Sequence, residues 1–242
     1  MIKFLILFLM ISVKAFAVDS VKVESKIYTA PFSDEYRTDT AQYKLPVITG
    51  GADANLLARL NSYLATDSLL FDNIDTVIAN YALCGCGTVG ADYNVLYNKN
   101  SVLSISVQIE TMGAYPDEYY KDVNLNLTTG SRILISHLIK KSKMTELAAE
   151  LDKSVQKRIK AKVKEEQIGE EDALQFFEGK KFSTDNLEDF AFTDKGVMFY
   201  YNFNLPHVLK ALSPDEDILM TWEEIEDYAR EGSLLQKIID KQ

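Results

Sequence analysis

The clearest structural signal in the sequence is residues 101–112, SVLSISVQIETM. Its apolar side chains occur at every second position, at Leu103, Ile105, Val107 and Ile109. The positions between them are polar: Ser104, Ser106, Gln108 and Glu110. A period of two is typical of a β-strand with one face in a core and the other in water. We therefore predict an antiparallel strand here, with a solvated polar face.

The same period continues on both sides of this strand. Tyr93, Val95 and Tyr97 alternate with other residues before the Asn98-Lys99-Asn100 turn, and a further strand is predicted over residues 121–128. Residues 18–49 are expected to be extended, 190–203 to form a hairpin around Asp194-Lys195-Gly196, and 218–222 to form a short strand. Most of these strands follow one another directly, which predicts antiparallel meander sheets.

Apolar spacings of three and four residues predict the helices. They occur at residues 56–64, where Asp53 can cap the N-terminus, and at residues 142–166, while a third helix is expected from Glu223. A short helix is also plausible at 172–177. Strands and helices do not alternate strictly. The predicted fold class is therefore α+β, with three main helices packed on the meander sheets.

The first seventeen residues are typical of a secretory signal peptide. Lys3 precedes a short apolar run, and Ala15-Phe16-Ala17 is a small-x-small cleavage site. The run is too short to span a bilayer, so no membrane span is expected after cleavage. A composition shift near residue 115 divides the rest into an N-terminal portion, 18–114, and a C-terminal portion, 115–242, expected to form one compact unit.

The charge balance narrows the classes of partner. The chain has 26 basic and 36 acidic residues, a formal net charge of −10. Residues 1–17 contain two lysines and no acid, so the remainder has 24 basic and 36 acidic residues, a net charge of −12. An acidic surface repels phosphate backbones, so nucleic acid is not an expected partner. A basic protein is a better candidate partner than nucleic acid, because its charge complements that of this chain.

Cys84-Gly85-Cys86 is the most unusual local motif, and three interpretations remain open. The two thiols can form a local disulfide in an oxidising compartment, can stay unpaired or bridge to another molecule, or can serve a redox or metal function. A zinc site would need both cysteines together with His137 and His207, the two histidines of the chain. No spacing signature supports that set, so we predict the Cys84–Cys86 disulfide and no metal.

No catalytic motif is present. The two histidines lie outside any recognisable nucleophile–base arrangement, and there is no glycine-rich phosphate loop. We therefore expect no enzymatic activity and no cofactor. Acidic residues at Asp117, Glu118, 215–217 and 223–227 leave an enzyme that uses carboxylates as an alternative. Most of these acids are expected to be solvated.

Residues 115–120, YPDEYY, form the predicted binding segment. It combines tyrosines and acids in an expected connection between two strands, where recognition residues are common. Packing of the tyrosines against the sheet edge explains the segment equally well. The predicted binding residues are Tyr115, Asp117, Glu118, Tyr119 and Tyr120.

The succession of segments resembles a family of bacterial extracytoplasmic domains of unknown function. The family includes the C-terminal domain of the lysozyme-sensing anti-sigma factor and the accessory domain of peptidoglycan deacetylases. The similar segments are residues 43–48 (YKLPVI), 55–64, 101–115, 120–127, 129–130, 135–139, 192–200 (FTDKGVMFY) and 218–225. One departure is Met112-Gly113-Ala114-Tyr115, where family members often have Gly-Gly-Ala-His, so a role of that histidine does not carry over.

The resemblance implies a non-catalytic binding protein of the cell envelope, periplasmic or secreted. The expected partner is a lysozyme-like muramidase or another basic envelope protein. The alternative is an accessory domain that contacts peptidoglycan or another cell-wall glycan.

Overall fold

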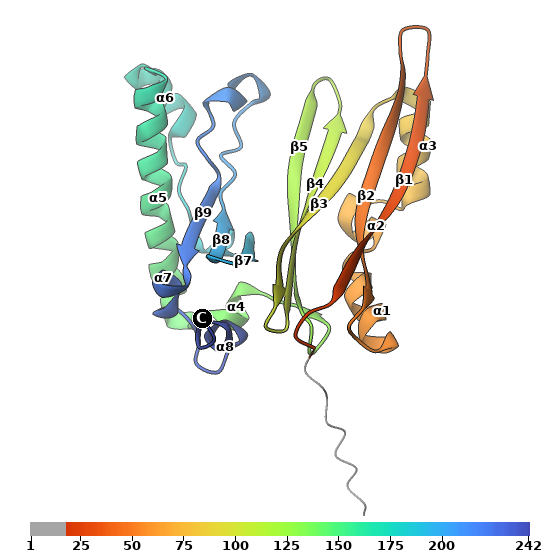
Figure 1. Cartoon of the computed structure of the whole chain (residues 1–242). Coiled ribbons are helices and arrows are strands. Elements are labelled where there is room, and N and C mark those ends of the chain that lie inside the picture. Colours follow the sequence, from red (N-terminus) through yellow and green to blue (C-terminus); the bar gives the residue numbers. More distant parts are fainter. Residues whose placement is uncertain (1–17) are drawn as a thin grey trace, which may run out of the picture.

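The computed structural model describes residues 18–242, and the predicted signal peptide, residues 1–17, lies outside the described residues. A six-stranded sheet in the order β1-β2-β3-β4-β5-β6 forms the centre (Figure 1). Its strands are β1 (Lys22–Ser33), β2 (Thr38–Gly50), β3 (Gly87–Lys99), β4 (Val102–Met112), β5 (Pro116–Asn126) and β6 (Ser131–Arg132). All neighbours are antiparallel except β2 and β3, which are parallel over a short stretch.

Three helices connect β2 to β3 and cover one face of this sheet. They are α1 (Ala54–Ser62), α2 (Thr66–Leu70) and α3 (Ile74–Cys84). Asp53 caps α1 as predicted, since its side chain accepts a hydrogen bond from the Leu56 N–H at 2.9 Å. The predicted apolar face of β4 packs here: Leu103, Ile105, Val107 and Ile109 are fully buried in the core that these helices close. α2 and α3 were not predicted from the sequence.

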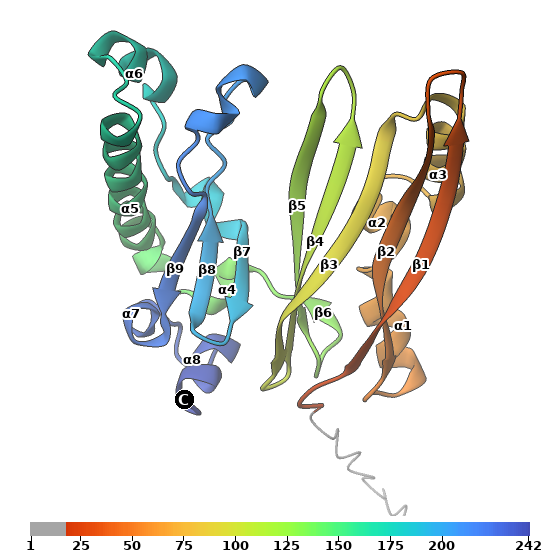
Figure 2. The same cartoon turned by 45° about the horizontal axis from the view of Figure 1, so that its top comes forward.

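A second sheet faces the opposite side of β3–β5. It has the order β7-β8-β9, with β7 (Phe190–Thr193), β8 (Gly196–Tyr200) and β9 (Asp217–Thr221). The long helix α5 (Met144–Glu165) lies outside it, as Figure 2 shows. Shorter helices complete this half: α4 (Ile135–Leu138), α6 (Glu170–Phe177), α7 (Trp222–Glu226), α8 (Leu234–Ile239) and the 3-10 helices η1 (Lys141–Lys143), η2 (Thr184–Glu188) and η3 (His207–Leu212).

The α+β class is confirmed, and most predicted elements are present. The predicted 142–166 helix is α5, and the predicted hairpin is β7–β8. The predicted C-terminal helix is two short helices, α7 and α8. The proposed boundary at residue 114 falls in the hairpin between β4 and β5, and both strands belong to the first sheet. Within residues 18–242, no helix combines the length and apolar character of a bilayer span.

The predicted solvated face of β4 is wrong for its first half. Ser104 is fully buried and Ser106 almost so, because β7 packs over this part of the strand. Gln108 is half-buried and Glu110 exposed, as expected for the part that β7 does not cover. The second sheet therefore covers only part of the first, and the uncovered part borders a cleft.

A buried polar network joins the two sheets at the covered part. The Ser104 hydroxyl donates to the Asn124 side-chain oxygen at 2.7 Å, and the Asn124 amide donates to the Phe190 carbonyl at 2.6 Å. The Phe192 N–H donates back to the Ser104 hydroxyl at 3.2 Å. Backbone groups at the free edge of β7 thus find partners on the face of the first sheet, which satisfies buried groups of both.

Candidate functional site: a cleft between the two sheets

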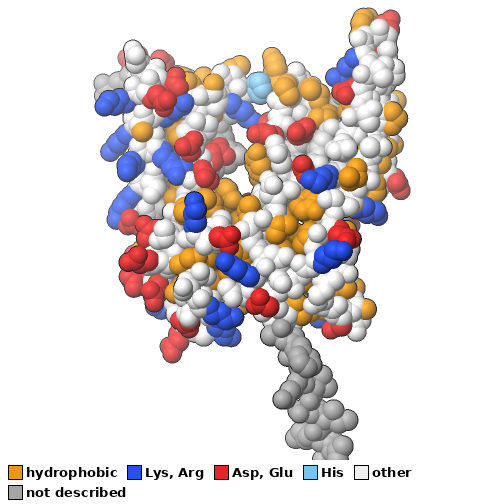
Figure 3. Space-filling model, viewed as in Figure 1, with side chains coloured by type: hydrophobic (Ala, Val, Ile, Leu, Met, Phe, Trp, Pro, Cys, Tyr) orange, Lys and Arg blue, Asp and Glu red, His pale blue; other side chains and the backbone are white. Residues whose placement is uncertain are grey.

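A cleft of about 550 Å³ opens where β5 and the segment 200–216 diverge. Glu118, Tyr120 and Asp122 line it from β5, and Tyr200, Asn202 and Glu216 line it from the other half. Arg132, Glu188 and Asp189 also border it. Figure 3 shows this hollow between the two halves of the molecule, with acidic side chains on both sides. Its size is in the range of small-molecule pockets, roughly 300–1,000 Å³.

The predicted binding segment lies at this cleft, but most of it is strand and not a loop, because β5 begins at Pro116. Tyr115 reaches across to the other half, where its ring stacks on His207 with centroids 4.7 Å apart and an interplanar angle of 18°. Asp117 forms an ion pair with Lys210. These two contacts, Tyr115–His207 and Asp117–Lys210, form a clasp between residues 115–117, where β5 begins, and η3.

The other three predicted residues separate, because successive side chains of a strand point to opposite faces. Glu118 and Tyr120 line the cleft, and Glu118 also accepts a hydrogen bond from Gln108 at 2.7 Å. Tyr119 also borders the cleft, but its ring packs near Phe71 on the helical side, with ring centroids 6.2 Å apart. The structure therefore brings Glu118 and Tyr120 into the cleft, places Tyr115 and Asp117 in the clasp, and turns the Tyr119 ring toward the helices.

Asp122 is the acid of the cleft whose pKa is shifted most. It lies directly opposite Ser106 in the β4–β5 register, at the border of the part that β7 covers. Its Oδ1 atom is buried and has no hydrogen-bond partner among the described residues. Burial raises the pKa of Asp122 to about 6, against a smaller opposing effect of the Ser106 hydrogen bond, and the nearby Asp189 charge raises it further.

The other side of the cleft contains two more acids whose pKa values are raised. Burial raises the pKa of Glu216, although hydrogen bonds from the Phe203 N–H and the Ser213 hydroxyl stabilise its charged form. Burial also raises the pKa of Asp189, while Arg132 lowers it. The Tyr200 hydroxyl has a raised pKa as well, mainly through burial and then through the charge of Asp122. Carboxylates without enough cationic partners are thus gathered here.

Two of the three bases that border the cleft are engaged elsewhere. The Lys121 ammonium donates to the Ser68 carbonyl and lies 4.1 Å from the centre of the Phe71 ring, on the helical side. Lys210 is paired with Asp117. The cleft therefore favours a cation or a group rich in hydrogen-bond donors. A carboxyl with a pKa near 6 is also suited to proton transfer. Cys84, Cys86 and His137 are not among the residues that line this cleft.

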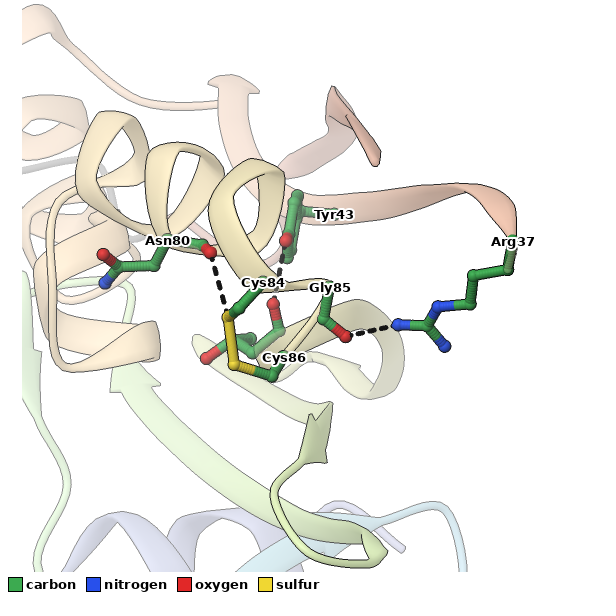
Figure 4. Close-up of a disulfide and its surroundings, with 7 residues drawn as sticks. Arg37, Tyr43, Asn80, Cys84, Gly85 and Cys86 are labelled. Atoms are coloured by element: carbon green, nitrogen blue, oxygen red, sulfur yellow. Dashed lines mark hydrogen bonds between the residues drawn. A yellow bond between two sulfur atoms is a disulfide. The ribbon is translucent and has the colours of Figure 1, made fainter. Parts of the chain in front are cut away.

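The cysteines form a disulfide at the C-terminal end of α3, with an S–S distance of 2.08 Å (Figure 4). Gly85 ends the helix in the left-handed region at φ 60°, and its carbonyl accepts a hydrogen bond from Arg37 at 2.6 Å. The Cys84 sulfur lies 3.3 Å from the Asn80 carbonyl, a contact and not a hydrogen bond because a disulfide sulfur carries no hydrogen. The motif links α3 to the β1–β2 hairpin.

The zinc alternative finds no support in the geometry. Both sulfurs are in the disulfide, and His207 stacks on Tyr115. Across the part of the chain that the structure describes, no three His, Cys, Asp or Glu side chains are grouped to hold a metal ion.

Sequence reasoning did not identify Asp122, Asp189 or Tyr200 as site residues. Asp122 was predicted only as a polar position of a strand, and nothing local distinguishes it from a solvated aspartate. Glu216 was named within the 215–217 acidic run, but without a link to β5. The pairing of Ser106 with Asp122 follows from the β4–β5 register and has no counterpart in the local sequence.

Comparisons with known proteins support the fold. The sequence matches no protein-family model, and no curated protein is significantly similar to it. A DUF3298 family member from Bacteroides fragilis NCTC 9343 has a similar structure, with a TM-score of 0.64, 12% identity, and coverage of 93% of this chain and 100% of that one. A DUF3298 family protein from Pseudomonas aeruginosa PAO1 gives 0.62, 9% identity, and coverage of 90% and 98%. The fold is thus similar to that of these two bacterial DUF3298 proteins over nearly the whole length of each chain.

Proposed function

We propose that this chain is an exported, non-catalytic binding protein of the cell envelope, periplasmic or secreted, whose cleft captures a basic protein. A lysozyme-like muramidase is the first candidate partner. The observation that carries the proposal is Asp122, a carboxylate that lines the cleft and whose buried Oδ1 atom has no hydrogen-bond partner among the described residues. A lysine or arginine side chain that enters the cleft would supply the missing charge and hydrogen bonds.

The overall charge supports the same kind of partner. A net charge of −12 on residues 18–242 attracts a cationic protein over distances longer than a contact, which raises the association rate and makes it sensitive to salt. Local and long-range electrostatics therefore favour one class of ligand.

Isothermal titration calorimetry with lysozyme, at about 20 mM and about 150 mM salt, tests this proposal. We expect binding that weakens with salt and that Asp122→Asn weakens at least about fivefold at both concentrations. Glu226→Gln is the matched control, since this exposed acid lies on α7 away from the cleft. Absence of heat at both salt concentrations, or an equal effect of the two variants, contradicts the proposal.

Cell-wall glycan is the second candidate ligand, and the tyrosines of the cleft favour it. Tyr120 is 56% exposed and Tyr200 lies across the cleft beside Asn202, a combination of aromatic faces and polar groups that suits sugar rings. Sedimentation with purified peptidoglycan tests it. Binding that Tyr120→Ala abolishes and salt leaves unchanged supports the glycan, with Tyr36→Ala, at the exposed tip of the β1–β2 hairpin, as the control. No sedimentation at either salt concentration rejects it.

A further inference from the structure

The outer edge of β5 has free backbone hydrogen-bonding groups beside the cleft. The Leu127 N–H donates to the Ser101 carbonyl on the β4 side, whereas the Ile133 N–H donates to the Asn124 carbonyl on the outer side. The β4–β5 register is regular throughout. Because backbone groups of an antiparallel strand alternate between its two edges, even-numbered residues of β5 direct their N–H and C=O groups outward.

β6 covers only the end of this edge. It pairs with Leu125 and Asn126, and in the described residues no strand pairs with β5 between Pro116 and Val123 on that side. Among the outward groups, the Glu118 N–H bonds to the Asp117 side chain at 2.7 Å. The Glu118 carbonyl and the N–H and C=O of Tyr120 and Asp122 have no hydrogen-bond partner in residues 18–242. An uncovered edge of this kind is a template for another strand.

The free edge and the cleft coincide. Glu118, Tyr120 and Asp122 are the residues whose backbone points outward, and all three also line the cleft with their side chains. Segment 200–216 forms the opposite wall, and the Tyr115–His207 and Asp117–Lys210 clasp spans one end. A peptide that enters the cleft can therefore pair its backbone with the edge of β5 and place its side chains against the acids that line the cleft.

We infer that the cleft binds an extended peptide segment of its basic partner, which adds as a strand to the outer edge of β5 and places a lysine or arginine side chain against Asp122. This inference rests on the proposed function and specifies its binding mode. Backbone pairing supplies affinity that is independent of sequence, and alternate side chains supply selectivity. A side chain directly across from Asp122 has its Cβ about 5 Å away on the same face, within reach of the carboxylate.

Charge complementarity selects this occupant. The acids that border the cleft are Glu118, Asp122, Glu188, Asp189 and Glu216, and Arg132 is the one bordering base, among the described residues, that is not already bonded to a group outside the cleft or in the clasp. An acidic peptide would add negative charge to this set of acids, whereas a basic peptide would neutralise part of their negative charge. Tyr120 and Leu205 offer apolar surface to the peptide's other residues.

The test uses the labelled peptide acetyl-Thr-Lys-Val-Lys-Val-Lys-Thr-amide, with binding measured by fluorescence anisotropy on the full chain. Two versions of the peptide are N-methylated on the backbone. One carries the methyl groups on the backbone nitrogens of the lysines, and the other carries them on the backbone nitrogens of the valines. In a paired strand only alternate N–H groups face β5. We therefore expect one methylated version to bind at least about tenfold more weakly and the other within about twofold of the parent peptide, because two or three hydrogen bonds are lost in the first alone.

The protein is unchanged in that comparison, so misfolding cannot account for the result. Asp122→Asn should weaken the parent peptide at least about fivefold, and Glu226→Gln should not. Equal effects of the two methylated versions, with lysozyme still bound, overturn the strand pairing and leave the proposed function standing. Failure of lysozyme and the peptide alike to bind overturns both.

Discussion

At the residue scale, Asp122 links the cleft to the stability of the protein. Its pKa is about 6 in the folded chain, above the ordinary value of 3.8. Between pH 4 and 6 the folded state therefore binds more protons at this site than the unfolded state, so stability falls as pH rises through this window. The shift corresponds to about 2 to 3 kcal/mol at neutral pH. Asp189 and Glu216, whose pKa values are also raised, act in the same direction.

Asp122→Asn isolates this contribution because the amide is nearly isosteric and uncharged. We expect the variant to gain about 2 kcal/mol in free energy of unfolding over the wild type at pH 7.5, and to lose this advantage at pH 4, where the wild-type carboxyl is protonated. Urea denaturation across pH 4–8 measures both. Glu226→Gln should follow the wild-type profile. A gain that is independent of pH would show that Asp122 does not titrate in this range.

At the element scale, the disulfide joins the end of α3 to the residue before β3 and holds Gly85, which contacts the β1–β2 hairpin. Gly85 lies between the cysteines, accepts the Arg37 hydrogen bond, and packs so closely to Phe32 that an added Cβ would lie 2.8 Å from that ring. The double variant Cys84→Ser/Cys86→Ser should lower the free energy of unfolding by about 1.5 kcal/mol, the value that the chain-entropy model gives for so short a loop. Hydrogen exchange should rise in the last turn of α3 and at the hairpin tip.

Thiol titration of the unfolded, unreduced protein checks the bond itself, with no free thiol expected. Two free thiols contradict the disulfide. Unchanged exchange at the hairpin tip in the double variant contradicts its role in holding that element. Reduced and alkylated wild-type protein should match the variant in both measurements.

The elements show what a sequence can reveal and what it cannot. Residues 101–112 were recognisable as β4 because a period of two over eight positions is a local property. Burial of Ser104 is not local, since it depends on β7, which lies more than 80 residues later. The cleft is likewise not a local property of the sequence. Residues 115–120 stood out by composition, but the association of Asp122 with Asp189 and Glu216 arises only when the second sheet is in place.

At the scale of the whole molecule, two cores meet at a polar seam. Helices α1–α3 close one core on the first sheet, and α5 closes the other on the second. Between the sheets, Ser104 and Asn124 bind the backbone of β7 with all partners buried. Such a network fixes the relative position of the sheets more strictly than apolar contact, because each donor must meet its acceptor. The width of the cleft next to it depends on that position.

Asn124→Ala tests whether this seam couples the two halves. The change leaves the Phe190 carbonyl and the Ser104 hydroxyl without their partner in a buried site, so we expect a loss of about 2 to 4 kcal/mol in free energy of unfolding. The width of the cleft depends on this seam. The affinity for lysozyme or for the lysine peptide should therefore also fall in Asn124→Ala, under conditions where the variant remains folded. Asn94→Ala, on the exposed surface of β3, should change stability by less than about 0.5 kcal/mol and leave binding intact. Equal stability of the two variants would mean that the sheets are held together by their apolar contacts alone.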